Sequence, residues 1–251
     1  MRISKSDNSI HRINLIYSGK NTEVSVGNIP CVFKKIKNKD DFRREMYVYL
    51  ISKHDNVLKY YHINSLDQII TMEFCEMSLF HRIYNPNKKE IPDKIKLKYI
   101  GEIIDGMIYL HEDLKVLHGD IKPANCLISK KRIKLCDFGH SVKINNFNPC
   151  NLFGTANYIL PDLIKEKKID NPKIIDIYAF GLLVWELYTR KIPFENIGGS
   201  YKILSKFKKS NEEIIVDLDI IQNPKIKTLI KNCLRKKYKS FIEIKKFLQK
   251  V

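Results

Sequence analysis

The sequence has few glycines and prolines and no closely spaced cysteine pair. Ten glycines and nine prolines among 251 residues leave little room for a long flexible linker, and no internal repeat is present. None of the six cysteines forms a Cys-x-x-Cys pair, and most stand inside apolar runs. This pattern favours reduced, buried thiols in a cytoplasmic or otherwise intracellular protein, with the nucleus not excluded.

Long apolar runs are also missing. Residues 1–19 contain no uninterrupted apolar stretch, so no secretory signal is expected. The longest apolar run, residues 177–188, is interrupted by Glu186 and is too short to span a bilayer. With a hydrophobic content of 44%, the chain is expected to be globular and to place this run in a buried helix.

Acidic residues are scarce relative to basic ones. The chain has 45 Lys and Arg against 28 Asp and Glu, which gives a formal charge of +17. Such a charge attracts nucleic acid, anionic membranes, acidic substrates or phosphates. The lysines are scattered through every segment, however, and no arginine cluster is interleaved with aromatic residues. The composition therefore favours a solvated basic surface, and nucleic-acid binding is possible but not favoured.

Two polar motifs organise the chain: residues 118–125 and, twelve residues after Asn125, the sequence Asp137-Phe138-Gly139. Two short apolar runs lie between them, joined by the charged connector 130–132. This arrangement predicts a β-hairpin. If the two strands pair symmetrically about Lys131, Asn125 and Asp137 lie side by side.

The mouth of this hairpin would collect groups that suit a metal–phosphate site. Asn125 and Asp137 would supply two oxygen ligands, Asp120 a further carboxylate and Lys122 an ammonium group. A small number of hard oxygen ligands is typical of Mg²⁺, which is usually shared with substrate phosphates. The sequence therefore predicts a magnesium and phosphate site here.

Hydrophobic periodicity predicts an α+β fold with two lobes and a ligand cleft between them. Residues 1–75 are expected to form a small lobe of five strands and one helix, and residues 76–251 a larger, mainly α-helical lobe. The predicted strands are 11–17, 24–26, 29–34, 57–63 and 68–74, and the small-lobe helix is 40–52. The predicted large-lobe helices are 78–83, 94–112, 172–189, 201–209, 224–234 and 239–248.

The order of the motifs over nearly the whole length resembles the eukaryotic-type protein kinase domain, over about residues 10–250. Further matching motifs are Gly154-Thr155, Leu160-Pro161-Asp162 and residues 176–181. The resemblance implies a kinase-like bilobal fold in a monomer, with ATP and Mg²⁺, and phosphoryl transfer to Ser or Thr hydroxyls of protein substrates. Lys122 and Thr155 follow the serine/threonine pattern, and residues 176–187 faintly resemble the Mos and Raf-like branch.

The resemblance also implies roles for the polar residues of the hairpin mouth. Asp120 would orient the attacking hydroxyl and accept its proton, and Lys122 would neutralise charge on the transferred phosphoryl group. Asn125 and Asp137 would hold Mg²⁺. Asp176 would accept backbone hydrogen bonds from the loop that carries Asp120.

The same resemblance implies an ATP site in the small lobe. Lys34 would contact the α- and β-phosphates, and Glu45 would pair with it. Lys35 is the competing lysine, but in the family a small residue lies two positions before the lysine on the same inward face, which fits Lys34 with Val32. The remaining expected members are Gly19 and Val24 of the glycine-rich loop, Val32, Met72 as gatekeeper, and Glu73 to Cys75 as hinge.

Several positions depart from the family pattern. Only Gly19 remains of the glycine-rich loop, which weakens the expected grip on phosphates. Gly119 replaces the arginine that in the family meets an activation-loop phosphate, and only Ser141 could be phosphorylated between residues 139 and 154. We therefore expect activity without activation-loop phosphorylation. Asp162 lacks its expected arginine partner, for which Arg235 is a candidate substitute.

Three other functions compete with an active protein kinase. A pseudokinase would keep the fold as a binding module without turnover, which the degraded glycine-rich loop allows. A small-molecule phosphotransferase of the aminoglycoside type would share the sequence His-Gly-Asp, although residues 137–139, 154–162 and 176–181 are protein-kinase features. A polyanion-binding protein would use the charge of +17 and would bind less tightly as salt increases.

Overall fold

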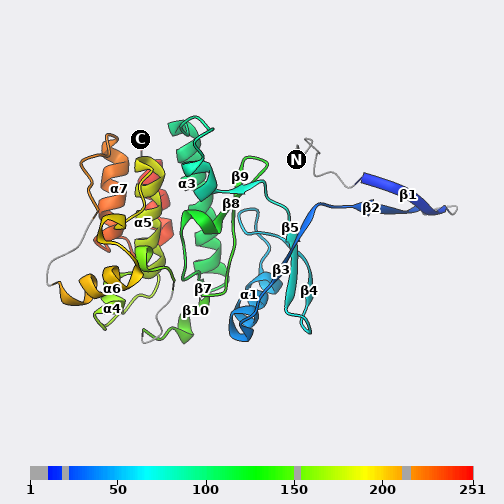
Figure 1. Cartoon of the computed structure of the whole chain (residues 1–251), viewed down its shortest axis with the longest axis horizontal. Coiled ribbons are helices and arrows are strands. Elements are labelled where there is room, and N and C mark those ends of the chain that lie inside the picture. Colours follow the sequence, from blue (N-terminus) through cyan, green and yellow to red (C-terminus); the bar gives the residue numbers. More distant parts are fainter. Residues whose placement is uncertain (1–10, 19–22, 150–153, 211–215, 251) are drawn as a thin grey trace.

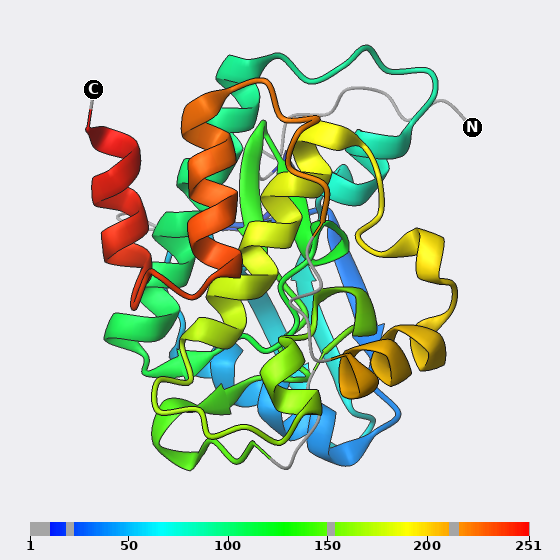
Figure 2. The same cartoon turned by 90° about the vertical axis from the view of Figure 1, so that its left-hand side faces the viewer.

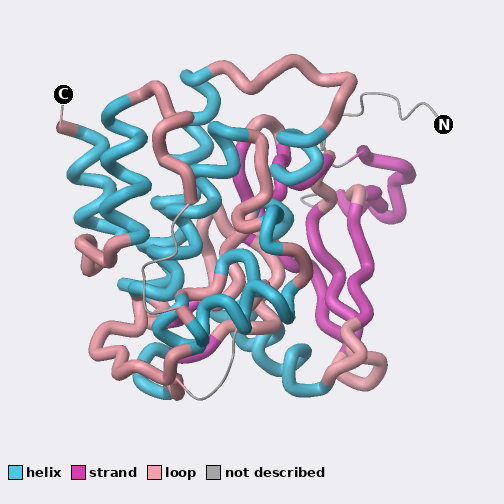
Figure 3. Tube along the Cα trace, turned by 60° about the vertical axis from the view of Figure 1, so that its left-hand side comes forward, coloured by secondary structure: helices cyan, strands magenta, loops and turns pink. Residues whose placement is uncertain are grey.

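The computed structural model describes residues 11–18, 23–149, 154–210 and 216–250. The described residues form a small strand-rich lobe and a larger helical lobe, as predicted (Figures 1 and 3). Among these residues, the structure has no helix with both the length and the apolar character needed to cross a bilayer.

The small lobe contains the five expected strands, divided between two antiparallel sheets. Strands β1 (His11–Ser18) and β2 (Glu23–Asn28) form one hairpin, which extends away from the rest of the lobe in Figure 1. Strands β3 (Cys31–Lys35), β5 (Ile69–Glu73) and β4 (Tyr60–Asn64) form the other sheet in that order. In its register Val32 lies opposite Met72 and Lys34 opposite Ile70.

Helix α1 (Lys39–Ile51) lies beside this sheet. Its N-cap is Asn38, whose side chain accepts hydrogen bonds from the backbone N–H groups of Asp40 and Asp41. The buried positions of α1 include Phe42, Glu45 and Tyr49, whereas Leu50 is 53% exposed. A carboxylate therefore lies in the middle of an otherwise apolar helix face.

The large lobe is built around α5 (Ile174–Thr189), in which every residue from Ile174 to Leu187 is buried. Figure 2 shows α5 running through the middle of the lobe with α7 packed beside it. Such burial on all sides explains the nearly continuous apolar sequence. The other helices are α2 (Leu79–Tyr84), α3 (Asp93–Ile108), α4 (Pro161–Ile164), α6 (Ser200–Lys209), α7 (Pro224–Leu234) and α8 (Phe241–Gln249).

Short elements lie between the helices and around the hairpin. Helix α3 continues into a π-helical turn, η1 (Tyr109–Asp113), and 3-10 turns occur at η2 (Pro123–Asn125), η3 (Ile144–Asn146), η4 (Ala156–Tyr158) and η5 (Glu195–Ile197). Strand β6 (Met77–Ser78) joins the hairpin sheet, and β7 (Val116–Leu117) pairs with β10 (Val142–Lys143).

The predicted hairpin is present as β8 (Cys126–Ser129) and β9 (Arg132–Leu135), but its register differs from the expected one. Ser129 lies opposite Arg132, so the turn has two residues, Lys130 and Lys131, and pairing centred on Lys131 is wrong. Both turn residues have positive φ, 48° and 63°, as the two-residue turns that suit twisted hairpins require. The N–H of Cys136 donates to the carbonyl of Asn125 at 3.0 Å, which leaves Asp137 one residue beyond the pair.

Candidate active site

Three charged side chains from distant segments meet at the edge of the small lobe. Lys34 Nζ of β3 lies 2.9 and 2.8 Å from the carboxylate oxygens of Glu45 in α1, and 2.9 Å from Asp137 Oδ1. Burial alone would lower the pKa of Lys34, but the two carboxylates outweigh it and raise that pKa. Burial raises the pKa of Asp137, but the Lys34 charge outweighs it and holds that pKa below its usual value. Lys35, the competing lysine, is exposed.

Helix α1 is also fixed to the segment 137–139. Arg44 Nε donates to the carbonyl of Gly139 at 2.5 Å. Phe138 is fully buried and packs edge-on against Tyr49, with ring centroids 5.2 Å apart. Glu45 is only 1% exposed, and burial raises its pKa against the opposing effect of Lys34. The helix therefore holds Glu45 against Lys34 through both polar and apolar contacts.

Asp120 is the centre of a second hydrogen-bond network. Its Oδ1 accepts from the backbone N–H and the hydroxyl of Thr155 at 2.9 and 2.8 Å. Its Oδ2 accepts from Lys122 Nζ at 2.6 Å and from Asn125 Nδ2 at 2.9 Å. The contact of Thr155 with Asp120 was not predicted, because the residues are 35 apart in sequence and only the Gly154-Thr155 motif pointed to this segment.

The donor set of Asn125 and Asp137 fits a hard cation shared with a substrate. Asn125 Nδ2 donates to the backbone carbonyl and the carboxylate of Asp120, which leaves Oδ1 as the amide atom available to a cation. The side chain of Asp137 is 44% exposed. Among the described residues, no group of three or more His, Cys, Asp or Glu side chains could hold a metal ion. A cation bound here would take its other ligands from substrate phosphates and water, as Mg²⁺ commonly does.

Asp176 of α5 supports the loop that carries Asp120, as expected. Its Oδ1 accepts from the Gly119 N–H at 2.9 Å, and its Oδ2 accepts from the His118 N–H at 2.8 Å and from His111 Nε2 at 2.8 Å. Burial acts to raise the pKa of Asp176, but the His111 contact and the other donors hold it below its usual value. Burial lowers the pKa of His118, whose ring packs against Phe138. A structural role for His118 therefore fits better than acid–base work.

Gly119 has a structural reason to be glycine. Its φ is +80°, and a Cβ there would lie 2.5 Å from the His140 carbonyl oxygen. Gly154, with φ of +88°, would place a Cβ 2.5 Å from the Gly119 carbonyl oxygen. The loop that carries Asp120 is thus packed backbone to backbone against both ends of the segment 140–154. An arginine at position 119 would not fit this contact.

The residues expected around the nucleotide base are only partly brought together. Val32, 41% exposed, and Met72, 5% exposed, lie opposite each other in the sheet. In the expected hinge, the N–H of Glu73 donates to the Lys59 carbonyl, and the Glu73 carboxylate lies 3.2 Å from Lys134. Burial raises the pKa of the Cys75 thiol to about 12. Gly19 lies outside the described residues. Val24 lies in β2, whose hairpin extends away from the other strands, so it does not join them (Figure 1).

Asp162 finds its cationic partner next to the residue proposed from the sequence. Its Oδ2 pairs with the ammonium group of Lys236, and its Oδ1 lies 3.9 Å from Lys167. Lys236 has positive φ, 55°, just after helix α7, a backbone turn that periodicity does not predict. This ion pair ties the end of the segment 154–162 to the C-terminal helices.

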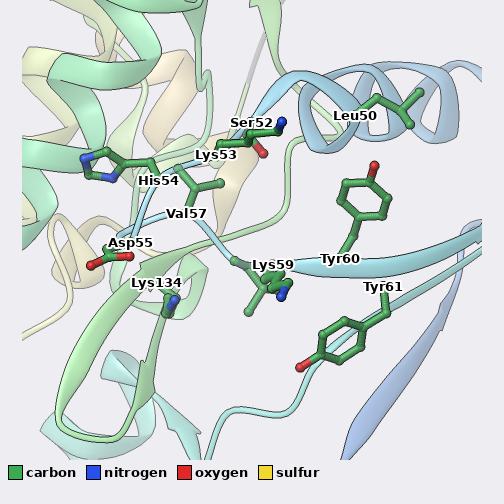
Figure 4. A pocket seen from close by; sticks show the side chains of 11 residues that line it. Leu50, Ser52, Lys53, His54, Asp55, Val57, Lys59, Tyr60, Tyr61 and Lys134 are labelled. Atoms are coloured by element: carbon green, nitrogen blue, oxygen red, sulfur yellow. The ribbon is translucent and has the colours of Figure 1, made fainter. Parts of the chain in front are cut away.

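A separate pocket lies at the C-terminal end of α1 (Figure 4). It has a volume of about 460 Å³ and is lined by the loop after α1, by Tyr60 and Tyr61 of β4, and by Lys134. None of the expected site residues lines it. The candidate active site is therefore the cluster around Asp120 and Asp137 and not this pocket.

Comparison with known proteins assigns the family. Residues 15–251 match the family model described as protein kinase domain. Among curated proteins, the chain is 34% identical over 150 residues to mitogen-activated protein kinase kinase kinase dlk-1 of Caenorhabditis briggsae, covering 58% of this chain and 17% of that protein. It is 31% identical over 208 residues to a putative mitogen-activated protein kinase kinase kinase 7-like protein of Drosophila melanogaster, covering 78% and 52%.

A third relative is the serine/threonine-protein kinase-transforming protein mos of Myeloproliferative sarcoma virus, 33% identical over 164 residues, covering 57% of this chain and 47% of the viral protein. The chain thus spans between about a sixth and about half of the length of these three relatives. The match to mos, whose name describes a serine/threonine-protein kinase, agrees with the resemblance inferred from the motifs. By the match over residues 15–251, this chain belongs to the protein kinase domain family.

Proposed function

We propose that this chain is a serine/threonine protein kinase that transfers the γ-phosphoryl group of Mg²⁺-bound ATP to Ser and Thr hydroxyls of proteins. The observation that carries the proposal is the meeting of Lys34, Glu45 and Asp137, from three separate segments, in one ion-paired cluster. We further propose one kinase domain of about residues 10–250, monomeric, whose small lobe ends near Cys75.

In this proposal Asp120 orients the acceptor hydroxyl and takes its proton. The new bond joins the acceptor oxygen to the γ-phosphorus, and the bond to the oxygen bridging the β- and γ-phosphates breaks. Lys122, 2.6 Å from Asp120, neutralises charge on the transferred group. Asn125 and Asp137 hold the magnesium ion, which supplies charge neutralisation on the phosphates when bound.

Lys34→Met and Lys35→Met form a matched pair that tests the nucleotide contact. We expect Lys34→Met to lower kcat/KM for ATP by about 10²-fold, the usual cost of removing one preorganised charged group. Lys35→Met should change it by less than about twofold, because an exposed side chain contributes little. Steady-state kinetics at varied ATP measures both. A larger loss in Lys35→Met would show that the wrong lysine has been assigned.

Three contacts support activity without activation-loop phosphorylation. Ser141 is only 3% exposed, and its hydroxyl donates to the His118 carbonyl at 3.2 Å. The Asp120–Thr155 bonds and the close approach of Gly119 to His140 are made without any phosphate group. A buried hydroxyl that already donates a hydrogen bond is a poor phosphorylation site. This supports a loop that takes up its active arrangement without a phosphate group.

Ser141→Ala is accordingly expected to keep kcat within about twofold of the wild type and to lower the free energy of unfolding by about 1 kcal/mol, the usual value of one hydrogen bond. Phosphatase-treated wild-type protein should keep the same kcat. Kinetics, urea denaturation and intact-mass measurement check these values. A folded Ser141→Ala variant that binds ATP but has lost activity would contradict phosphate-independent function.

The function itself is tested by incubating the full chain with Mg²⁺ and labelled ATP. Generic protein acceptors should gain phosphoserine or phosphothreonine, and chelation of Mg²⁺ should stop the reaction. Nucleotide binding without transfer to any acceptor would favour the pseudokinase alternative. Transfer to an aminoglycoside or choline panel but not to protein would favour a small-molecule phosphotransferase.

A further inference from the structure

Helix α6 presents four lysines to solvent. Lys202, Lys206 and Lys209 are spaced so that they share one helix face, and Lys208 lies beside them; all four are exposed. The opposite face is fixed in the core by Ile203 and by Phe207, whose ring packs edge-on against Phe194 at 5.3 Å. The lysine face is therefore held outward by the packing of the helix.

These lysines lack the carboxylate partners that other lysines have. None of the four forms an ion pair with a residue in the described part of the chain, whereas Lys173 pairs with Glu112 and Lys245 with Asp105. Like charges three and four residues apart repel one another on a helix. The helix dipole favours the lysines of the last turn but not Lys202 in the first turn. Within the described residues, the repulsion on this face is thus left without a paired carboxylate.

The lysine face belongs to the same part of the large lobe as Asp120. Helix α6 packs against η4 and against α4, and α4 and α6 lie side by side in Figure 1. Both η4 and α4 directly follow Thr155, whose hydroxyl and N–H are bonded to Asp120. A protein segment that reaches Asp120 along residues 155–164 would therefore lie next to α6.

Two carboxylates near this surface already have partners within the protein. Glu186 of α5 is fully buried and accepts hydrogen bonds from the hydroxyls of Tyr84, at 2.9 Å, and Tyr158. Burial raises the pKa of Glu186 to about 7, so its negative charge is weakened at neutral pH. Asp162 is paired with Lys236. The connection from α5 to α6 carries a single carboxylate, Glu195, and the acidic residues that follow α6 in sequence lie outside the described residues.

Resting on the proposed kinase activity, we propose that α6 and residues 155–164 form a docking surface for acidic protein substrates, whose Ser or Thr acceptor is flanked by Asp or Glu. Charge complementarity is the physical basis, because exposed lysines attract a carboxylate-bearing segment and orient it toward Asp120. An acidic protein fits better than nucleic acid, since α6 has one exposed aromatic residue, Tyr201, and no arginine.

The test compares two triple variants of the full chain with the same formal change in charge. One carries Lys202→Glu, Lys206→Glu and Lys209→Glu on α6. The matched control carries Lys94→Glu, Lys131→Glu and Lys246→Glu, which are exposed lysines on other elements than α6 and without an ion pair to a described residue. Each is assayed with two serine peptides of equal length, one flanked by Asp and Glu and one flanked by Lys and Arg.

We expect the wild type to have a KM about tenfold lower for the acidic peptide, from a few exposed ion pairs acting together. The α6 variant should lose that preference with kcat within about twofold, while the control keeps it. The KM of the wild type for the acidic peptide should also rise with salt. Unchanged kcat on the basic peptide shows that the α6 variant is folded.

Other results overturn the inference in distinguishable ways. A preference for the basic peptide, or an α6 variant that behaves like the control, removes the docking surface but leaves the kinase activity standing. A single-stranded RNA that binds through the α6 lysines without any change in peptide KM assigns the surface to nucleic acid instead. Failure of the wild type to phosphorylate either peptide counts against the proposed function itself.

Discussion

Asp137→Asn is expected to lower phosphoryl transfer by about 10³-fold or more while leaving the protein folded. The substitution keeps the shape of the side chain but removes the charge that pairs with Lys34 and faces the proposed magnesium site. The lowered pKa of Asp137 means that this charge is present at neutral pH. Because the side chain is 44% exposed, losing the ion pair should cost only about 1 kcal/mol of unfolding free energy.

Kinetics, ATP titration and urea denaturation together check this expectation. The variant should still bind ATP, but Mg²⁺ should no longer increase the ATP affinity, whereas we expect that increase in the wild type. Asp219→Asn is a suitable control, because Asp219 also pairs with a lysine, Lys227, but lies on the exposed surface of the large lobe. Activity within about tenfold of the wild type would contradict the proposed role of Asp137.

Gly119→Ala is expected to reduce both stability and activity. A left-handed φ costs a non-glycine residue about 1–2 kcal/mol, and the added Cβ would lie 2.5 Å from the His140 oxygen, so one of the two backbones has to move. We expect a total loss of about 2–4 kcal/mol in unfolding free energy. Activity should fall as well, because Asp120 is the next residue in the chain. Urea denaturation and kcat measure the two effects.

Gly101→Ala is the matched control for this experiment. Gly101 lies in α3, and a Cβ there would meet nothing within 4 Å. Replacing it should raise stability by about 0.5–1 kcal/mol, because alanine is the better helix former. A Gly119→Ala variant as stable as Gly101→Ala would mean that the close approach to His140 is unimportant. Gly119→Arg should be at least as damaging as Gly119→Ala and should not create dependence on a phosphate.

Much of the fold could be predicted because it depends on local pattern. The apolar sequence of residues 177–188 predicted a buried helix, and α5 is buried on all sides. The five strands follow from alternation and turn residues. The turn at Lys130 and Lys131 could not be predicted in this way, because neither residue is the glycine or asparagine that normally signals positive φ.

The polar contacts of the site could likewise be predicted only where they depend on local pattern. Lys34 was preferred to Lys35 because alternation along a strand decides which face a side chain takes, and Lys34 is the one that reaches Glu45. The bond from Thr155 to Asp120 and the pairing of Lys236 with Asp162 join residues far apart in sequence. Such contacts depend on how elements pack together, which periodicity does not contain.

The backbone contact between Gly119, His140 and Gly154 has a consequence for how the protein responds to its surroundings. An arginine–phosphate clamp is an exposed electrostatic contact, which weakens gradually as ionic strength rises. Close packing of uncharged backbone atoms is hardly screened by salt and is lost only when the segment opens as a unit. The geometry around Asp120 is therefore tied to the local folding equilibrium of the backbone at His140 and Gly154. For this backbone contact, heat or denaturant is expected to have a larger effect than ionic strength.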